Sequence, residues 1–220
     1  MLALSDTCTA AMTGKGGLCG CLSSSSLGHL RAVAGDVRLE TGAVLFHGGD
    51  AADAIFGVRQ GTLMMSRRLG RHRRQVLSFH FSGDMVGFAE DGRHQAEAVA
   101  LERVSLCRIP LSQLDEDRAL QGHVLGIARR NLMQCLDLQM RLGRMNAAER
   151  VAALLAELYT RLGGGEALHL PMRVVDMADY LGLRPETVSR EISALRHAGI
   201  VGAFTEGVLT VHDGQRLCRP

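Results

Sequence analysis

A stretch of thirty residues near the C-terminus constrains the fold more than any other part of the chain. It covers residues 172–201 and reads MRVVDMADYLGLRPETVSREISALRHAGIV. Apolar residues recur at helical spacing on both sides of Gly182, a residue that can adopt a positive φ without steric cost. Pro185 suits the first turn of a helix, because its φ is preset and no N–H is needed there. The pattern predicts two short helices joined by a tight turn, a helix-turn-helix.

The second helix of this pair has an apolar side and a polar side. Its apolar stripe consists of Val188, Ile192 and Leu195, and the polar residues around its first two turns are Arg184, Glu186, Thr187, Ser189 and Arg190. In a helix-turn-helix, the N-terminal residues of the second helix meet base edges in the major groove. Arginine can donate a forked pair of hydrogen bonds to guanine, glutamate can accept one from cytosine, and serine can bond a base or a phosphate. We therefore predict that these polar residues bind DNA; the alternative is a solvated helix face with no ligand.

A β-hairpin is predicted directly after the second helix. Gly199 suits the position that ends the helix, because it tolerates a left-handed conformation. Two short runs of β-forming residues, Val201–Phe204 and Val208–Val211, then flank Gly207. A hairpin in this place is the wing of a winged helix-turn-helix.

The string ADYLGLRPETVSREISALRHAGIV resembles the DNA-binding helices of the Crp/Fnr family of bacterial transcription regulators. Its E-x-x-S-R pattern is similar to that of the fumarate and nitrate reduction (FNR) branch, whereas the catabolite activator branch has R-E-x-x-G-R. The resemblance implies a homodimer that binds double-stranded DNA at an inverted repeat, with half-sites like TTGAT. It also implies contact with RNA polymerase. The sequence leaves open whether the protein activates or represses.

The composition agrees with a DNA-binding protein of the cytoplasm. The formal net charge is only +2, so affinity for DNA would come from local basic clusters rather than from the whole chain. No apolar run approaches eighteen residues, and no Lys or Arg precedes an apolar stretch at the N-terminus. We therefore expect neither a membrane span nor a secretory signal, and a cytoplasmic location.

Two other classes of function compete with DNA binding. The sequence contains no P-loop, no G-x-S-x-G elbow, no H-E-x-x-H motif and no EF-hand loop, so we do not expect an enzyme. A β-roll that binds a small molecule without binding DNA is the second alternative. The E-x-x-S-R face and the predicted wing favour DNA binding over that alternative.

The rest of the chain predicts an α+β protein in four parts. Residues 1–26 are rich in Gly, Ser and Cys; residues 27–120 form a sensor domain, 121–146 a dimerisation helix, and 147–220 the winged helix-turn-helix. The sensor domain shows short strands separated by glycines, as in a jelly roll: Val44–Phe46, Ile55–Val58, Leu63–Met65 and Val76–Phe81. Its segments GAVLFHGGD, FGVRQGTLMMSR, FHFSGDMVGF and VSLCRIP resemble the cyclic-nucleotide-binding-like β-roll of the same family.

A long helix is predicted over residues 121–145. Apolar residues follow alternating spacings of three and four through Leu125, Ala128, Leu132, Cys135 and Leu142, interrupted by Gln139. A second stripe consists of Leu132, Leu136 and Met140. One stripe can pack against the β-roll and the other against a partner, and the resemblance makes this the dimer helix. We expect Leu125, Leu132, Leu136 and Leu142 at the interface.

A further helix is predicted over residues 146–162. Asn146 is a suitable N-cap, and Glu149 stands three residues later, which together form a capping box. This segment resembles the N-A-E-E-R helix that opens the DNA-binding domain of the FNR branch.

Six cysteines raise the question of a metal cofactor. Cys8, Cys19 and Cys21 lie in the first 21 residues, and Cys107 lies in the segment VSLCRIP. Four thiolates can hold a [4Fe–4S] cluster. The resemblance implies that Cys107 is the β-roll ligand of such an oxygen-sensitive cluster, with the other three as N-terminal ligands. The spacing C-x10-C-x-C differs from the C-x2-C pairs of the family. Cys135 and Cys218 are expected to be dispensable.

Two other ligands are suggested by the resemblance. For cAMP, the family uses a Gly-Glu pair and a downstream Arg-Ser pair, but Phe88 follows Gly87 here and His94-Gln95 replaces Arg-Ser. Without a guanidinium the phosphate has no forked partner, so the sequence disfavours cAMP, although Arg93 is one position away. For haem, the available axial ligands are His29, His47, His72 and His80. Regulation without any ligand is the remaining possibility.

Overall fold

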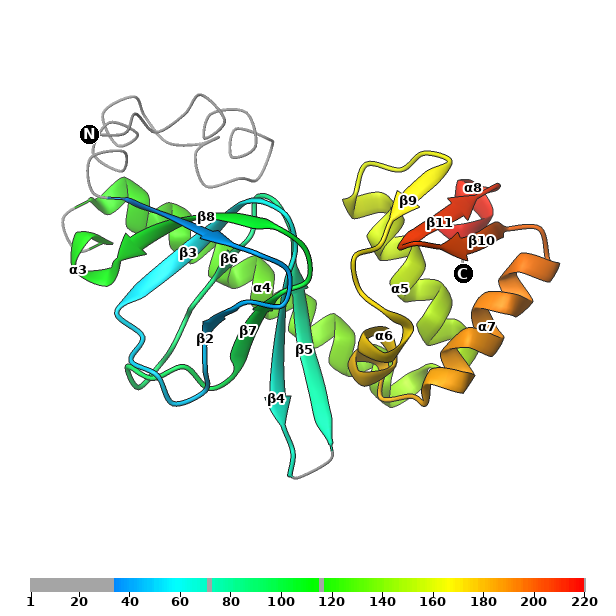
Figure 1. Ribbon diagram of the computed structural model, residues 1–220, viewed down its shortest axis with the longest axis horizontal. Coiled ribbons are helices and arrows are strands. Elements are labelled where there is room, and N and C mark those ends of the chain that lie inside the picture. Colours follow the sequence, from blue (N-terminus) through cyan, green and yellow to red (C-terminus); the bar gives the residue numbers. More distant parts are fainter. Residues whose placement is uncertain (1–33, 71–72, 115–116, 220) are drawn as a thin grey trace. The chain divides into compact units, whose positions relative to one another are not determined.

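The computed structural model describes residues 34–70, 73–114 and 117–219 (Figure 1). These residues form two compact units. Of the described residues, the first unit contains those from 34 to Arg73 and from Leu77 to Gln134, and the second contains Arg74–Val76 and those from Cys135 to 219. The first unit is rich in strands and the second is rich in helices, which confirms the predicted α+β class.

The first unit is a sandwich of two antiparallel sheets. One sheet has the order β1-β8-β3-β6 and the other β2-β7-β4-β5. The strands are β1 (Gly35–Leu39), β2 (Val44–Phe46), β3 (Ala54–Gln60), β4 (Leu63–Arg68), β5 (Arg74–His80), β6 (Met85–Val86), β7 (Glu97–Ala100) and β8 (Val104–Pro110). Apolar side chains from both sheets, including Phe56, Leu63 and Leu106, fill the space between them. The predicted β-roll is therefore present.

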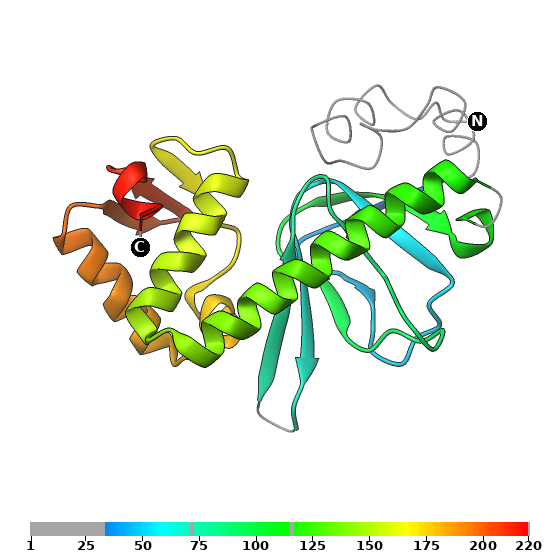
Figure 2. The same ribbon diagram turned by 180° about the vertical axis from the view of Figure 1, so that it is seen from behind.

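A long helix covers the outer face of the first sheet. After the short α3 (Leu111–Leu114), α4 runs from Arg118 to Arg144 and crosses in front of the strands in Figure 2. Its first half buries Leu120, Val124 and Ile127 against side chains of β3, β6 and β8. None of the helices in the described part of the chain is both long and apolar enough to cross a membrane.

The second unit contains the predicted winged helix-turn-helix. Its helices are α5 (Ala147–Arg161), α6 (Val174–Leu181), α7 (Pro185–His197) and α8 (Gly214–Leu217). Its antiparallel sheet has the order β10-β11-β9, from β9 (Ala167–His169), β10 (Val201–Thr205) and β11 (Val208–Val211). The hairpin turns at Glu206 and Gly207, both at positive φ. The sequence did not predict β9, because three residues after a glycine run show no periodicity.

Candidate DNA-binding surface

The turn between α6 and α7 has the geometry that its residues predict. Gly182 lies at φ 64° and ends α6, while the N–H of Leu183 donates to the carbonyl of Ala178 over 3.0 Å. A β-carbon at this φ would be strained, so glycine is favoured here. Pro185 occupies the first turn of α7, and Arg184 precedes it without a side-chain cap. The turn thus fixes the direction in which α7 leaves α6.

The polar residues of α7 lie where a DNA groove can reach them. Val188 and Ile192 are buried in the second unit. The opposite side of α7 therefore faces solvent. Arg184, Glu186, Ser189 and Arg190 are exposed, and Thr187 is half-buried. The structure therefore places the five residues singled out in the sequence around the first two turns of one helix, with four of them open to solvent.

The guanidinium of Arg190 already has a partner. Its Nε and Nη2 donate to Oε1 of Glu191 over 3.1 and 3.0 Å. Arg190 is 71% exposed but Glu191 only 16%, so the carboxylate is held while the arginine is open to a ligand. The donors on Nη1 are not used in this pair, and they remain available for a base or a phosphate. Helical periodicity did not indicate Glu191 as a partner of Arg190, because neighbouring residues on a helix do not share a face.

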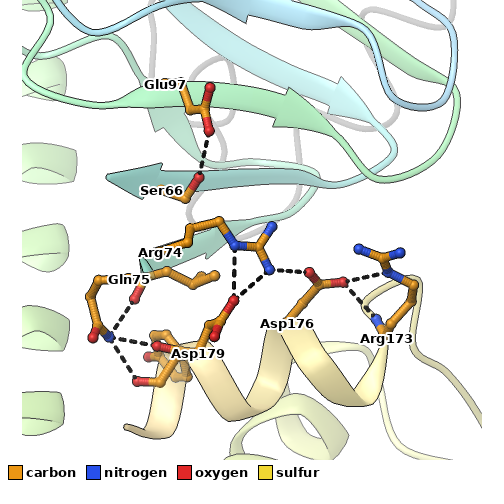
Figure 3. A network of polar contacts seen from close by, with 9 residues as sticks. Ser66, Arg74, Gln75, Glu97, Arg173, Asp176 and Asp179 are labelled. Atoms are coloured by element: carbon orange, nitrogen blue, oxygen red, sulfur yellow. Dashed lines mark hydrogen bonds and ion pairs between the residues drawn. The ribbon is translucent and has the colours of Figure 1, made fainter. Parts of the chain in front are cut away.

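An ionic network holds α6 in place (Figure 3). Arg74 is the first residue of β5 and belongs to the second unit. Its Nη2 donates to Asp176 over 2.6 Å and to Asp179 over 2.7 Å. The N–H of Arg173 and its Nε donate to the other oxygen of Asp176 over 3.0 and 3.2 Å. Gln75 donates to the carbonyl of Asp179 over 2.6 Å. These hydrogen bonds hold α6, the helix before the turn, through both its side chains and its backbone.

The carboxylate at the centre of this network is ionised and buried. The side chain of Asp176 is 1% exposed. Burial by itself would raise the pKa of Asp176, but hydrogen bonds from Arg173 and Arg74 outweigh that effect and hold the pKa below its ordinary value. The two carboxylates also keep the pKa of Arg74 above its ordinary value despite burial. No motif in the sequence links Arg74 to these residues, since about a hundred positions separate them.

One face of α4 is apolar and uncovered. Leu125, Leu132, Leu136 and Met140 follow spacings of seven, four and four and are 70%, 54%, 47% and 59% exposed. Met133, beside them, is 51% exposed. Exposed apolar side chains in a continuous stripe are typical of an interaction surface. Leu142, expected in the same interface, is half-buried, and its Cδ2 lies near Gly182; its place in an interface stays a prediction.

Cys107 faces α4. It is 1% exposed and packs in one cluster with Ile109, Leu120, Val124 and Ile127. Its predicted co-ligands Cys8, Cys19 and Cys21 lie outside the described residues, while Cys135 and Cys218 are exposed. Within residues 34–70, 73–114 and 117–219, no three His, Cys, Asp or Glu side chains are grouped as metal ligands. Of the four cysteines predicted to hold a [4Fe–4S] cluster, the described residues therefore include one, Cys107.

His94 stands where the resemblance would place the phosphate-binding arginine of the family. The ring of His94 stacks on Phe46 at 3.6 Å between centroids and 9° between planes. Burial lowers the pKa of His94, which favours the neutral ring, although nearby Asp50 and Asp53 oppose this. Arg93, the neighbouring guanidinium, donates instead to the carbonyl of Gly49 over 2.7 Å. A neutral stacked ring cannot replace a cation as the partner of a cyclic phosphate.

Two of the four histidines named for haem, His47 and His80, lie among the described residues. His80 is buried, and its Nε2 is hydrogen-bonded with Ser78 over 2.8 Å. His47 is exposed and lies 4.0 Å from a carboxylate oxygen of Glu97. His29 and His72 lie outside the described residues.

Comparison with known proteins matches both units. Residues 36–116 match the family model of the cyclic nucleotide-binding domain, and residues 149–219 match that of the Crp-like helix-turn-helix domain. The nitrogen fixation regulation protein FixK of Bradyrhizobium diazoefficiens is 32% identical over 208 residues, which cover 91% of this chain and 87% of that protein. The chain belongs to the Crp/Fnr family of transcription regulators.

Other members of the Crp/Fnr family give the same result. The fumarate and nitrate reduction regulatory protein of Escherichia coli is 30% identical over 195 residues, covering 82% of this chain and 76% of that protein. The structure of FixK2 from Bradyrhizobium japonicum is 30% identical, with a TM-score of 0.79, and covers 84% of this chain and 96% of that one. Because both FixK and FNR proteins are among these relatives, membership of the FNR branch stays a prediction.

Proposed function

We propose that this Crp/Fnr protein acts in the cytoplasm as a homodimer that binds an inverted-repeat DNA site through α7 and contacts RNA polymerase. The observation that supports it most directly is the exposed group of Glu186, Ser189 and Arg190 on the side of α7 opposite the buried Val188 and Ile192. A gel shift with a duplex containing two inverted TTGAT half-sites tests it, with a scrambled duplex of equal length as the control. Equal binding to both duplexes would contradict sequence-specific recognition.

The proposed roles within α7 can be separated by substitution. Arg190→Ala should weaken binding to the cognate duplex by about 1–3 kcal/mol and relax the preference at one base pair, because a forked contact to a guanine is lost. Binding should be measured on the cognate duplex and on duplexes with each base pair of one half-site changed.

Arg196→Ala is the matched control for this experiment. Arg196 is also exposed on α7 but lies in its last turn. This variant should leave the base preference unchanged. If Arg190→Ala weakens binding to every duplex by the same factor, Arg190 contacts a phosphate and not a base.

For the signal, we propose an oxygen-sensitive [4Fe–4S] cluster held by Cys8, Cys19, Cys21 and Cys107. The supporting observation is that Cys107 packs directly against Leu120, Val124 and Ile127 of α4. When bound, the cluster would supply a redox-sensitive link between the N-terminal segment and the β-roll. A change at Cys107 would then alter the packing of α4, the helix whose outer face is the proposed dimer interface. We also propose that the four predicted parts of the chain are divided at residues 26, 120 and 146.

The cluster proposal predicts bound iron. Protein purified without oxygen should contain about four iron atoms and four sulfides per chain, with visible absorbance that disappears in air. Cys107→Ala should abolish the iron and the absorbance, because one of four ligands is lost. Cys135→Ala and Cys218→Ala are the controls and should retain both, since these cysteines are exposed and outside the proposed ligand set. Wild-type protein without iron and sulfide, or a Cys107→Ala variant that keeps them, would contradict the cluster.

A further inference from the structure

Three helices of the second unit meet at one arginine. Arg150, in the first turn of α5, is half-buried. Its Nη2 donates to the carbonyl of Leu142 over 2.8 Å and its Nε to that of Met145 over 2.9 Å. Its Nη1 donates to the carbonyl of Leu181 over 3.1 Å. Arg150 therefore connects the end of α4, the start of α5 and the last residue of α6.

The three carbonyls have the chemistry that an arginine satisfies. The last carbonyls of a helix have no partner within the helix, and the helix dipole concentrates negative charge there. Leu142 and Leu181 lie at two such C-terminal ends, and Met145 follows the end of α4. A guanidinium has five N–H donors in one rigid plane, so a single side chain can serve all three acceptors in fixed directions. A lysine has a single nitrogen on a flexible stem and cannot hold the same geometry.

The link between α4 and α5 is restrained at two further points. Asn146 and Glu149 exchange the two hydrogen bonds of a capping box, over 3.1 and 2.8 Å. Arg141 of α4 pairs with Glu157 of α5 over 2.6 Å, and both side chains are mostly covered. Those restraints lie within the α4–α5 corner, whereas the hydrogen bond from Arg150 to Leu181 connects this corner to α6.

We propose that Arg150 sets the distance between the two DNA half-sites that the protein accepts. The inference rests on the proposed function, a homodimer on an inverted repeat. Leu136 and Met140 of the exposed stripe lie on the last turns of α4, within the second unit. The α6 end that Arg150 holds leads directly into Gly182 and α7. The guanidinium therefore fixes the angle between the proposed dimer helix and the DNA-binding helix.

The spacing of half-sites is sensitive to this angle. Each base pair added between the half-sites moves the second one by about 3.4 Å and rotates it by about 35° around the duplex. A rigid pair of α7 helices matches one spacer and loses contacts on the others. If the hydrogen bond between Arg150 and α6 is lost, the two α7 helices can reorient to reach the second half-site at a lower cost in free energy. Discrimination between spacers therefore decreases.

The test measures dissociation constants for duplexes with two TTGAT half-sites and a spacer of variable length. Wild-type protein should bind the preferred spacer at least about tenfold more tightly than spacers one base pair shorter or longer, a difference of about 1.4 kcal/mol. In Arg150→Gln and Arg150→Lys that ratio should fall to within about threefold. Arg190→Ala is the control: it lowers affinity at every spacer and keeps the wild-type ratio, because it acts on a base and not on the angle.

The outcomes separate this inference from the proposed function. Wild-type protein that binds no inverted repeat would overturn the proposed function and this inference with it. Wild-type protein that discriminates between spacers, with Arg150 variants that keep the same ratio, would overturn the inference alone. Circular dichroism and thermal melting accompany each variant. If both Arg150 variants lose the folded state, Arg150 is a residue of general stability and the inference is wrong.

Discussion

Leu132→Asp should convert the protein from a dimer into a monomer. Leu132 is 54% exposed at the centre of the uncovered stripe on α4, flanked by Leu125 and Leu136. If this stripe is the homodimer interface, the substitution buries one unpaired carboxylate from each protomer, close to its symmetry mate. A penalty of about 4 kcal/mol would weaken dimerisation roughly a thousandfold. Sedimentation velocity over a range of protein concentrations measures the change.

A second leucine provides a matched control for that experiment. Leu69, in the segment between β4 and β5, is 51% exposed and does not belong to the stripe on α4. Leu69→Asp should therefore leave the sedimentation coefficient unchanged. The Leu132→Asp monomer should also lose most of its affinity for a two-half-site duplex while keeping its weak affinity for a single half-site. An unchanged dimer for Leu132→Asp would exclude this face of α4 as the interface.

Local features of this protein could be predicted from the sequence. Gly182 predicted the turn because glycine adopts a φ of 64° without the strain that a β-carbon usually causes there. Asn146 and Glu149 predicted the start of α5 because a capping box needs only residues three positions apart. The apolar stripe of α7 predicted which side is buried, and Val188 and Ile192 are indeed buried. Each inference used neighbours along the chain, within a single turn or helix.

Contacts between distant segments could not be predicted in this way. Arg74 and Asp176 are 102 positions apart, and nothing in the β-strand pattern around Arg74 indicates a partner on α6. Leu142 follows the heptad spacing of the proposed interface, yet it is half-buried beside Gly182. Helical periodicity identifies the apolar positions, but it does not show which of several neighbouring elements each one contacts. The same limit applies to Arg150, whose three acceptors are backbone atoms that any sequence would present.

Asp176→Asn should be the most destabilising of the conservative substitutions on α6. Asp176 is 1% exposed and accepts hydrogen bonds from Arg74, from the Arg173 side chain and from the Arg173 N–H. Removing one partner from a buried ion pair costs about 3–5 kcal/mol. The loss should lie near the lower end, because Arg74 keeps its bond to Asp179. Urea unfolding, followed by circular dichroism at pH 7, measures this free energy.

The pH dependence of this loss identifies its cause. The pKa of Asp176 in the folded protein lies below its ordinary value of 3.8, so the folded state binds this proton less readily than the unfolded state does. The ionised carboxylate therefore contributes its full stabilisation above about pH 4, and that contribution is lost as the pH falls through the folded pKa. The difference in unfolding free energy between wild type and Asp176→Asn should be constant from pH 7 to pH 5 and should shrink toward pH 3.

Asp179→Asn separates the effect of burial from that of charge. Asp179 shares Arg74 with Asp176, but its side chain is 28% exposed, so water can replace part of the lost interaction. Its substitution should cost less than half as much as Asp176→Asn at pH 7. If the two variants lose the same stability, or if the loss in Asp176→Asn stays constant down to pH 3, packing around α6 and not the buried carboxylate holds this helix in place. In that case the ion pair between Arg74 and Asp176 would result from the position of α6 and would not determine it.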